Sequence, residues 1–122
     1  MGRVVALPES IRISLEEFFD GDIKRVRVIE NSFFAALHWN ASATTRRRHI
    51  YLRGSADDFF KDPALILHEY FHVMNQWEPR LLTTVRYMLE WIKRGYWNNR
   101  FEVEARQFTE ANLAAFQGML FR

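Results

Sequence analysis

The sequence has no cysteine, only 3 prolines and 5 glycines, and no hydrophobic run long enough to cross a bilayer. The lack of cysteine excludes disulfide frameworks, thiolate metal sites and a cysteine nucleophile. Low proline and glycine exclude collagen-like and linker-like chains. The apolar stretch at residues 4–7 is too short for the core of a signal peptide. We therefore expect a cytoplasmic protein with no membrane partner, and delivery by a route other than Sec stays open.

The composition is that of a folded globular protein. The 122 residues are 48% hydrophobic and 26% charged, which predicts one domain spanning residues 1–122. Aromatic residues reach 16%, and their large rings supply buried area to a small core. The net charge of +2 is mild, so the composition does not demand an acidic partner.

Hydrophobic periodicity predicts an α+β fold, a short N-terminal sheet followed by an active-site helix and two further helices. In the first half, the pattern indicates a helix over 10–19, a strand over 23–29, a short helix over 31–39 and a strand over 50–52. In the second half it indicates helices over 62–77, 80–94 and 99–117. Asp62-Pro63 and Asn99 mark two of the helix starts, and Gly95 closes the middle helix.

His68, Glu69 and His72 form the pattern H-E-x-x-H within the helix predicted over 62–77. Residues four apart share a helix face, so both imidazoles can reach one ion. Zn²⁺ binds neutral imidazole readily, and a glutamate beside the first ligand can take a proton from metal-bound water. The alternative is a pair of core histidines, because this helix is apolar on most sides. The pattern favours a zinc site with His68 and His72 as ligands and Glu69 as general base.

A catalytic zinc site needs a third protein ligand, and the last predicted helix offers Glu102 and Glu104. Glu104 lies within the apolar stripe of that helix. The stripe runs through Phe101, Ala105, Phe108, Ala111/Asn112 and Ala115. A buried carboxylate needs a compensating partner, which a metal ion would supply. Glu102 lies on the solvated face and is explained by a capping box with Asn99. We therefore predict Glu104 as the third ligand, with a buried ion pair to Arg86 or Arg100 as the alternative.

Two histidines, one glutamate and an open fourth position are the arrangement of single-zinc hydrolases. We expect zinc-activated water to attack a peptide bond, while zinc and one side-chain donor stabilise the oxyanion. That donor stays open among Tyr87, Tyr96, His38 and Arg100. So short a chain leaves little protein to wall off a deep cleft, which predicts a shallow groove suited to a peptide or protein substrate. If the strand over 50–52 is a sheet edge, it can pair with an extended substrate.

An H-E-x-x-H helix with a downstream Glu104-Ala105 resembles the gluzincin-type zinc metallopeptidases. Within that group the chain is similar to the extracellular contractile injection system core family over roughly residues 7–77. The similar blocks are Leu7-Pro8, Val26-Arg27-Val28, Ile50-Tyr51-Leu52 and the H-E-x-x-H block with Gln76. The resemblance implies a minimal zincin-like fold, His68 and His72 as ligands, and Glu69 as general base. It also implies association with a larger secretion or phage-tail-like assembly.

Two other functions compete with the peptidase. The first is a non-catalytic zincin-like binding or structural module, in which some of the four tryptophans (Trp39, Trp77, Trp91 and Trp97) form an exposed patch. The second is nucleic-acid binding through Arg46, Arg47 and Arg48, with His49 and Tyr51 beside them. A net charge of only +2 is low for the second role, so we expect no nucleic-acid partner.

Overall fold

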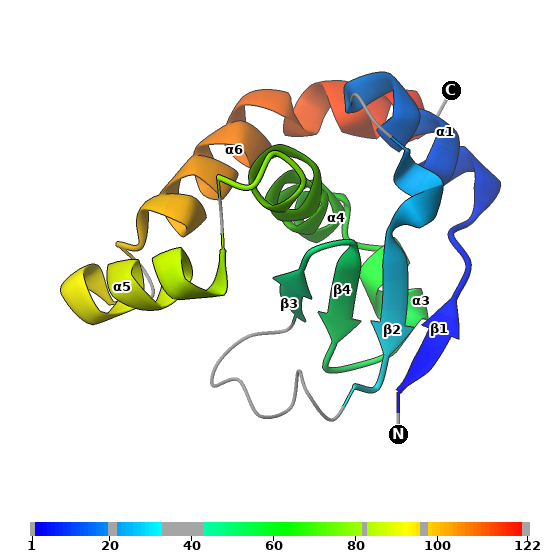
Figure 1. The fold of residues 1–122 in the computed structure, drawn as a ribbon. Coiled ribbons are helices and arrows are strands. Elements are labelled where there is room, and N and C mark those ends of the chain that lie inside the picture. Colours follow the sequence, from blue (N-terminus) through cyan, green and yellow to red (C-terminus); the bar gives the residue numbers. More distant parts are fainter. Residues whose placement is uncertain (1, 20–21, 33–42, 82, 96–97, 121–122) are drawn as a thin grey trace.

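The predicted α+β class is confirmed by the computed structural model, which describes residues 2–19, 22–32, 43–81, 83–95 and 98–120. Four strands form one sheet, and helices gather on one side of it and at its end (Figure 1). The strands are β1 (Arg3–Val5), β2 (Arg27–Glu30), β3 (Ala43–Arg46) and β4 (His49–Leu52). The helices are α1 (Glu9–Phe18), η1 (Ile23–Arg25), α3 (Ala56–Phe60), α4 (Pro63–Phe71), η2 (His72–Trp77), α5 (Thr84–Arg94) and α6 (Arg100–Leu120).

The sheet has the order β1-β2-β4-β3. β1 runs antiparallel to β2, β2 runs parallel to β4, and β3 runs antiparallel to β4. The strand predicted over 50–52 is therefore confirmed as β4, but it lies inside the sheet. Among the described strands, β3 occupies the edge on that side. Any strand addition next to the site would have to use β3 rather than β4.

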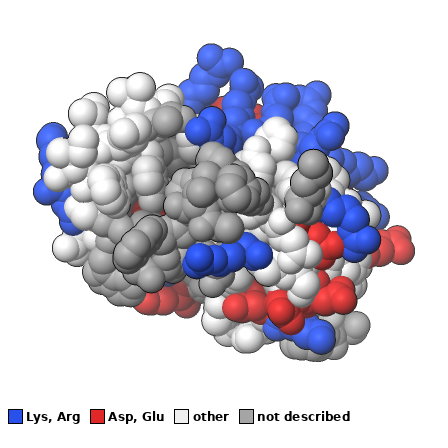
Figure 2. Space-filling model, turned by 90° about the horizontal axis from the view of Figure 1, so that it is seen from below, with Lys and Arg blue, Asp and Glu red and all other residues white. Residues whose placement is uncertain are grey.

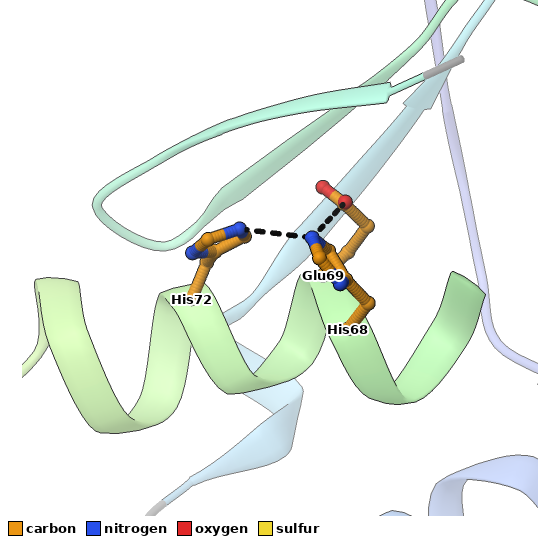
Figure 3. Close-up of side chains that lie close together, drawn as sticks. All are labelled: His68, Glu69 and His72. Carbon is orange, nitrogen blue, oxygen red and sulfur yellow. Dashed lines mark hydrogen bonds and ion pairs between the residues drawn. The ribbon is translucent and has the colours of Figure 1, made fainter. Parts of the chain in front are cut away.

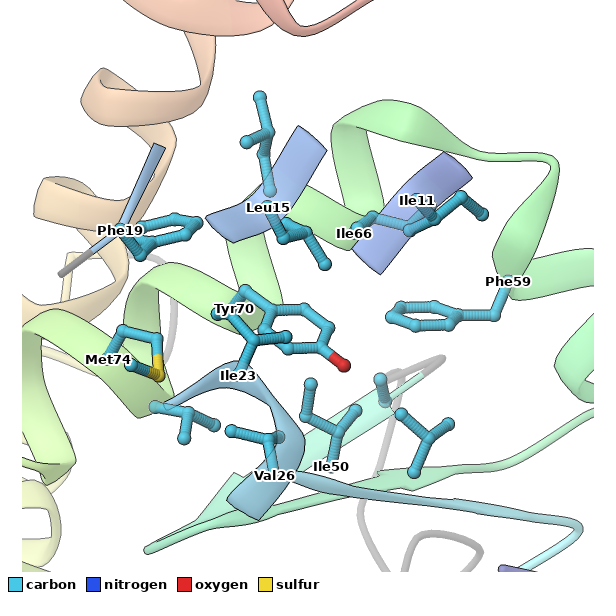
Figure 4. Close-up of a cluster of buried hydrophobic side chains, with 14 of the residues drawn as sticks. Ile11, Leu15, Phe19, Ile23, Val26, Ile50, Phe59, Ile66, Tyr70 and Met74 are labelled. Atoms are coloured by element: carbon cyan, nitrogen blue, oxygen red, sulfur yellow. The ribbon is translucent and has the colours of Figure 1, made fainter. Parts of the chain in front are cut away.

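The hydrophobic core lies between the sheet and α4 (Figure 4). Val28 of β2 and Ile50 of β4 are register partners and both are buried. They face Ile66 and Tyr70, which lie one turn apart on α4 and are also buried. Leu15 brings α1 onto the same cluster. With its apolar side held by the core, α4 presents another side to α6, with which it packs extensively (Figure 1).

The helix predicted over 62–77 is confirmed in extent. Its start is fixed by Asp62, whose Oδ1 accepts a hydrogen bond from the Leu65 N–H at 3.1 Å, with Pro63 in the first helical position. The helix continues from α4 into a π-helical segment, η2, which begins at His72. Such segments are rare and are often found at functional sites.

Other predicted elements differ in detail from the structure. Residues 23–25 form a 3-10 turn rather than a strand, because the Asp22 side chain accepts from the Lys24 N–H and caps that turn. The helix predicted over 80–94 begins later, at Thr84, where the Thr83 hydroxyl accepts from the Arg86 N–H. Most of the helix predicted over 31–39 lies outside the described residues. Within the described part of the chain, no helix is both long and apolar enough to cross a membrane.

Candidate metal centre

The two histidines of the H-E-x-x-H motif point toward each other from one face of the α4–η2 helix (Figure 3). His68 lies in the last turn of α4 and His72 follows one turn later. Their Nε2 atoms are 3.2 Å apart, and the ring planes are inclined at 81°. The predicted convergence of both imidazoles on one point is therefore confirmed.

The carboxylate that meets this pair belongs to Glu102, in the first turn of α6. Its Oε1 atom lies 3.2 Å from His68 Nε2 and 2.5 Å from His72 Nε2. Only 6% of the Glu102 side chain and 19% of the His68 side chain are exposed. Two imidazole nitrogens and one carboxylate oxygen thus converge in a largely buried site that opens to solvent at His68.

The prediction that Glu104 faces inward is wrong. Its side chain is 48% exposed and lies 3.7 Å from the guanidinium of Arg100, one turn earlier on the same helix. The buried side of α6 instead contains Glu102, Ala105, Thr109 and Phe116. Thr109 tolerates burial because its hydroxyl donates to the Ala105 carbonyl at 2.8 Å, within the helix. At 100° per residue, the centre of this set lies about 80° from the centre of the predicted stripe, on the side of Glu102.

Glu69 is the third residue of the motif, and it is buried beside the two imidazoles. Its Oε1 atom lies 3.8 Å from His68 Nε2 (Figure 3). One ligand atom from each of His68, Glu69 and His72 lies within 4.8 Å of the other two. These three residues could therefore hold a metal ion, and Glu102 adds a second carboxylate from another helix.

Gln76 contacts the cluster, and sequence analysis did not single it out for a role. The Nδ1–H of His72 donates to Gln76 Oε1 at 2.6 Å, and Gln76 Nε2 donates to the Phe101 carbonyl at 3.0 Å. Gln76 therefore fixes the His72 ring and joins it to α6 beside Glu102. The signal was present, because His68, His72 and Gln76 are spaced four apart and share one helix face.

The ionisation of the cluster follows from burial and opposite charge. Burial disfavours the charged ring of His72, but its hydrogen bond to Glu102 and the charges of Glu102 and Glu69 outweigh burial and raise the pKa of His72 to about 9. Burial also opposes ionisation of Glu102, yet its hydrogen bonds to the two imidazoles hold its pKa well below the usual range. Glu69 differs, because its burial dominates and raises its pKa.

The donor set fits a tetrahedral divalent cation. Ligand bonds of 2.0–2.1 Å around a tetrahedral ion place neighbouring donor atoms about 3.3 Å apart. The separations of 3.2 Å from His68 Nε2 to His72 Nε2 and to Glu102 Oε1 already match this spacing. The 2.5 Å separation between His72 and Glu102 would need to widen by less than about 1 Å.

The four residues considered as oxyanion donors differ in burial and in their surroundings. Tyr87 is partly buried, and its pKa is raised by burial and then by the negative charges of Glu102 and Glu69, which places it within electrostatic reach of the cluster. Arg100 is exposed and pairs with Glu104. Tyr96 and His38 lie outside the described residues.

The arginine run begins with Arg46, the last residue of β3, and continues through the turn that leads to β4. Arg48 adopts a left-handed backbone conformation with φ of 62°, and its Nε donates to Glu78 Oε1 at 2.7 Å. The positive charge of the run is therefore partly neutralised by Glu78, the residue that follows η2. His49 stacks on Tyr51 with ring centroids 5.7 Å apart.

Most of the chain matches a known protein family. The family model of the eCIS core domain matches residues 6–80, which is more than half of the chain and includes the whole H-E-x-x-H helix. No curated protein and no solved structure matches the chain. The matched residues end before α5 and α6, so Glu102 lies outside the match. The chain belongs to the eCIS core domain family.

Proposed function

We propose that this protein is a zinc-dependent metallopeptidase in which His68, His72 and Glu102 hold the ion. The observation that carries the proposal is the convergence of three donor atoms within 3.2 Å of one another, with Glu69 buried beside them. Two imidazoles and one carboxylate from different helices are a known ligand set of catalytic zinc. Bound zinc supplies Lewis acidity, which lowers the pKa of water and polarises a carbonyl group.

Glu69 acts as the general base. It follows the first ligand in the sequence, and its carboxylate lies beside His68, where the cluster opens to solvent. Because burial raises its pKa, its carboxylate is a better proton acceptor than an exposed glutamate. Glu69 Oε1 takes a proton from the attacking water and later gives it to the leaving amine. Tyr87 is the favoured oxyanion donor among the described candidates, because it is partly buried and feels the charges of both glutamates, whereas Arg100 is exposed and pairs with Glu104.

The substrate is an extended peptide segment that pairs with β3. The Trp77 indole N–H donates to the Thr45 hydroxyl at 3.2 Å, which ties this edge strand to the helix that carries His72. Among the described strands β3 forms this edge of the sheet, and an edge strand can pair with the backbone of an incoming chain. Backbone pairing at β3 would place a peptide bond beside the cluster without a deep cleft.

The test is proteolysis of an unfolded protein such as reduced casein by zinc-loaded wild type and by Glu69→Gln. The Glu69→Gln variant should retain zinc and lose activity by at least about a hundredfold, because general-base catalysis contributes 10²–10⁴-fold. Glu104→Gln is the matched control on an exposed carboxylate and should retain full activity. Equal activity in wild type and Glu69→Gln would refute the assigned base.

A second candidate is a non-catalytic module of an injection-system assembly. The family match supports this candidate, and so does the burial of His72, which limits access to the cluster. In that case zinc would hold α6 against η2 and have no substrate. Zinc binding by wild type with no cleavage of any unfolded substrate would favour this function over the peptidase.

A further inference from the structure

Helix α5 turns its apolar side chains outward, to solvent. Val85 and Ile92 are 68% and 70% exposed, and Met88, Leu89 and Trp91 are each more than half exposed. Figure 2 shows uncharged side chains gathered at the left, the end of the molecule that α5 occupies in Figure 1, with Lys and Arg atoms at their outer edge. A contiguous apolar surface of this kind indicates an interaction site.

The apolar face of α5 is broad. At 100° per residue, the five side chains cover about 160° of the helix circumference, which is wider than the narrow seam of a coiled coil. The inner side of α5 carries Tyr87 and Glu90, which are only partly exposed. Within the described part of the chain, α5 packs extensively against no other helix or strand.

The charges around this face are positive. Arg86, Lys93 and Arg94 are exposed, whereas Glu90, the only acidic residue of α5, is turned inward. Glu90 Oε2 lies 3.5 Å from Arg94 Nε, which neutralises it further. Arg86 also donates from Nη1 to the Leu81 carbonyl at 2.9 Å, yet three cations against one carboxylate leave α5 with a net positive charge. The surface therefore combines exposed aliphatic groups, one tryptophan and a net positive charge.

These charges argue against a second copy of the chain as the occupant. Antiparallel pairing of two α5 helices would bring the cations of one copy next to those of the other, since Arg86 lies near one end and Lys93 and Arg94 near the other. A partner surface that is both apolar and anionic is complementary to the apolar side chains of α5 and also to its cations. A bilayer with acidic headgroups has this chemistry and can accommodate a broad convex helix face without a matching groove.

We propose that α5 docks on an anionic membrane surface, with its apolar side chains at the boundary between headgroups and acyl chains. Lys93 contacts the lipid phosphates, Arg86 and Arg94 add positive charge beside it, and Trp91 lies at the interface. This contact lies along the surface and needs no membrane-spanning segment, so it revises the expectation of no membrane partner. The proposal does not depend on catalysis by the metal centre.

The test is flotation of the full chain with vesicles of two compositions, phosphatidylcholine alone or mixed with phosphatidylglycerol. Each cation near an anionic surface contributes roughly fivefold to binding, so we expect at least about tenfold tighter binding to the mixed vesicles. Met88→Asp should abolish flotation. Val4→Asp, at an equally exposed apolar side chain on β1, is the matched control and should float like wild type.

Charge is tested separately. Lys93→Glu should weaken binding to the mixed vesicles at least about tenfold because it reverses one cation, whereas Lys24→Glu on η1 should not. Circular dichroism should confirm that all variants are folded, as expected for exposed positions. Equal binding to both vesicles, no binding to either, or reversible dimerisation abolished by Met88→Asp would each overturn the proposal.

Discussion

The Nδ1–H of His72 donates to Gln76 Oε1 at 2.6 Å, and both residues lie on the helix that carries the motif. Because Gln76 also donates to the Phe101 carbonyl, it connects the imidazole to the first turn of α6. His72 Nε2 is thereby directed at the Oε1 atom of Glu102, and Glu102 directly follows Phe101 in the sequence. The Gln76 side chain therefore orients one proposed zinc ligand and anchors the helix that carries another.

Replacing Gln76 by Leu should weaken zinc binding by about 10–100-fold, the usual loss when the hydrogen-bond partner of a ligating histidine is removed. Competition with a chromophoric chelator measures this affinity. Gln76→Glu keeps an acceptor for His72 Nδ1–H but loses the donor to the Phe101 carbonyl, so its affinity should lie between those of wild type and Gln76→Leu. If Gln76→Leu binds zinc as tightly as wild type, the hydrogen bond does not support the site.

Tyr70→Phe should leave the free energy of unfolding unchanged or raise it by about 1 kcal/mol. The Tyr70 hydroxyl is fully buried and has no hydrogen-bond partner among the described residues, so its removal relieves a desolvation cost (Figure 4). Tyr70→Ala is the comparison and should lower stability by about 3–5 kcal/mol because it leaves a cavity. Urea unfolding measures both. A loss above about 1 kcal/mol in Tyr70→Phe would mean that the hydroxyl is hydrogen-bonded.

Glu30 should make stability depend on pH in the acid range. Its Oε1 accepts from the Ala56 N–H at 2.9 Å, and its Oε2 pairs with Arg3. The bond from Ala56 lowers the pKa of Glu30 below its ordinary value of 4.5, burial opposes this, and Arg3 lowers it further. A lowered folded-state pKa gives stability that is present above pH 4.5 and is lost as the pH falls.

Glu30→Gln tests this dependence, since the amide can still accept from Ala56 but carries no charge for Arg3. The urea midpoint of wild type should exceed that of Glu30→Gln near neutral pH, and the difference should shrink as the pH falls below about 4.5. A difference that stays constant or grows on acidification would contradict the assignment.

The parts of the site that sequence analysis predicted correctly depend on local helix geometry. His68 and His72 converge because residues four apart meet on any α-helix, and Asp62-Pro63 fixes where this helix begins. The third carboxylate depends instead on the rotational phase of a helix far along the chain. That phase is decided by Phe116 and by Thr109, whose hydroxyl is satisfied within the helix and so is compatible with burial.

Local and tertiary contacts compete directly at Glu102. The capping box predicted with Asn99 forms only in part, because Asn99 Oδ1 accepts from the Phe101 N–H at 2.8 Å while Glu102 binds the histidines. For a buried carboxylate, hydrogen bonds from two imidazoles are more favourable than one hydrogen bond from a backbone N–H. Similarly, the apolar periodicity of α5 is correctly predicted, but periodicity alone does not reveal whether that face meets a core or solvent.

The shortest elements contain too few residues for a periodic pattern to predict them. β1 has three residues and β3 has four, with Thr44 and Thr45 at its centre in place of large apolar residues. α3 is a five-residue helix whose start is marked by Ser55, which caps the Asp58 N–H. Their positions are fixed by pairing and packing with β2, β4 and α4, and these contacts are not encoded within each segment.

The assignment of Glu102 to the metal centre is tested most directly by zinc titration of wild type, Glu102→Ala and Glu104→Ala. The two glutamates lie two residues apart on α6, yet one side chain is 6% exposed against the histidines and the other is 48% exposed. We predict about one zinc per chain in wild type and Glu104→Ala, and weakened or lost binding in Glu102→Ala. Loss of zinc in Glu104→Ala with full binding in Glu102→Ala would contradict the account.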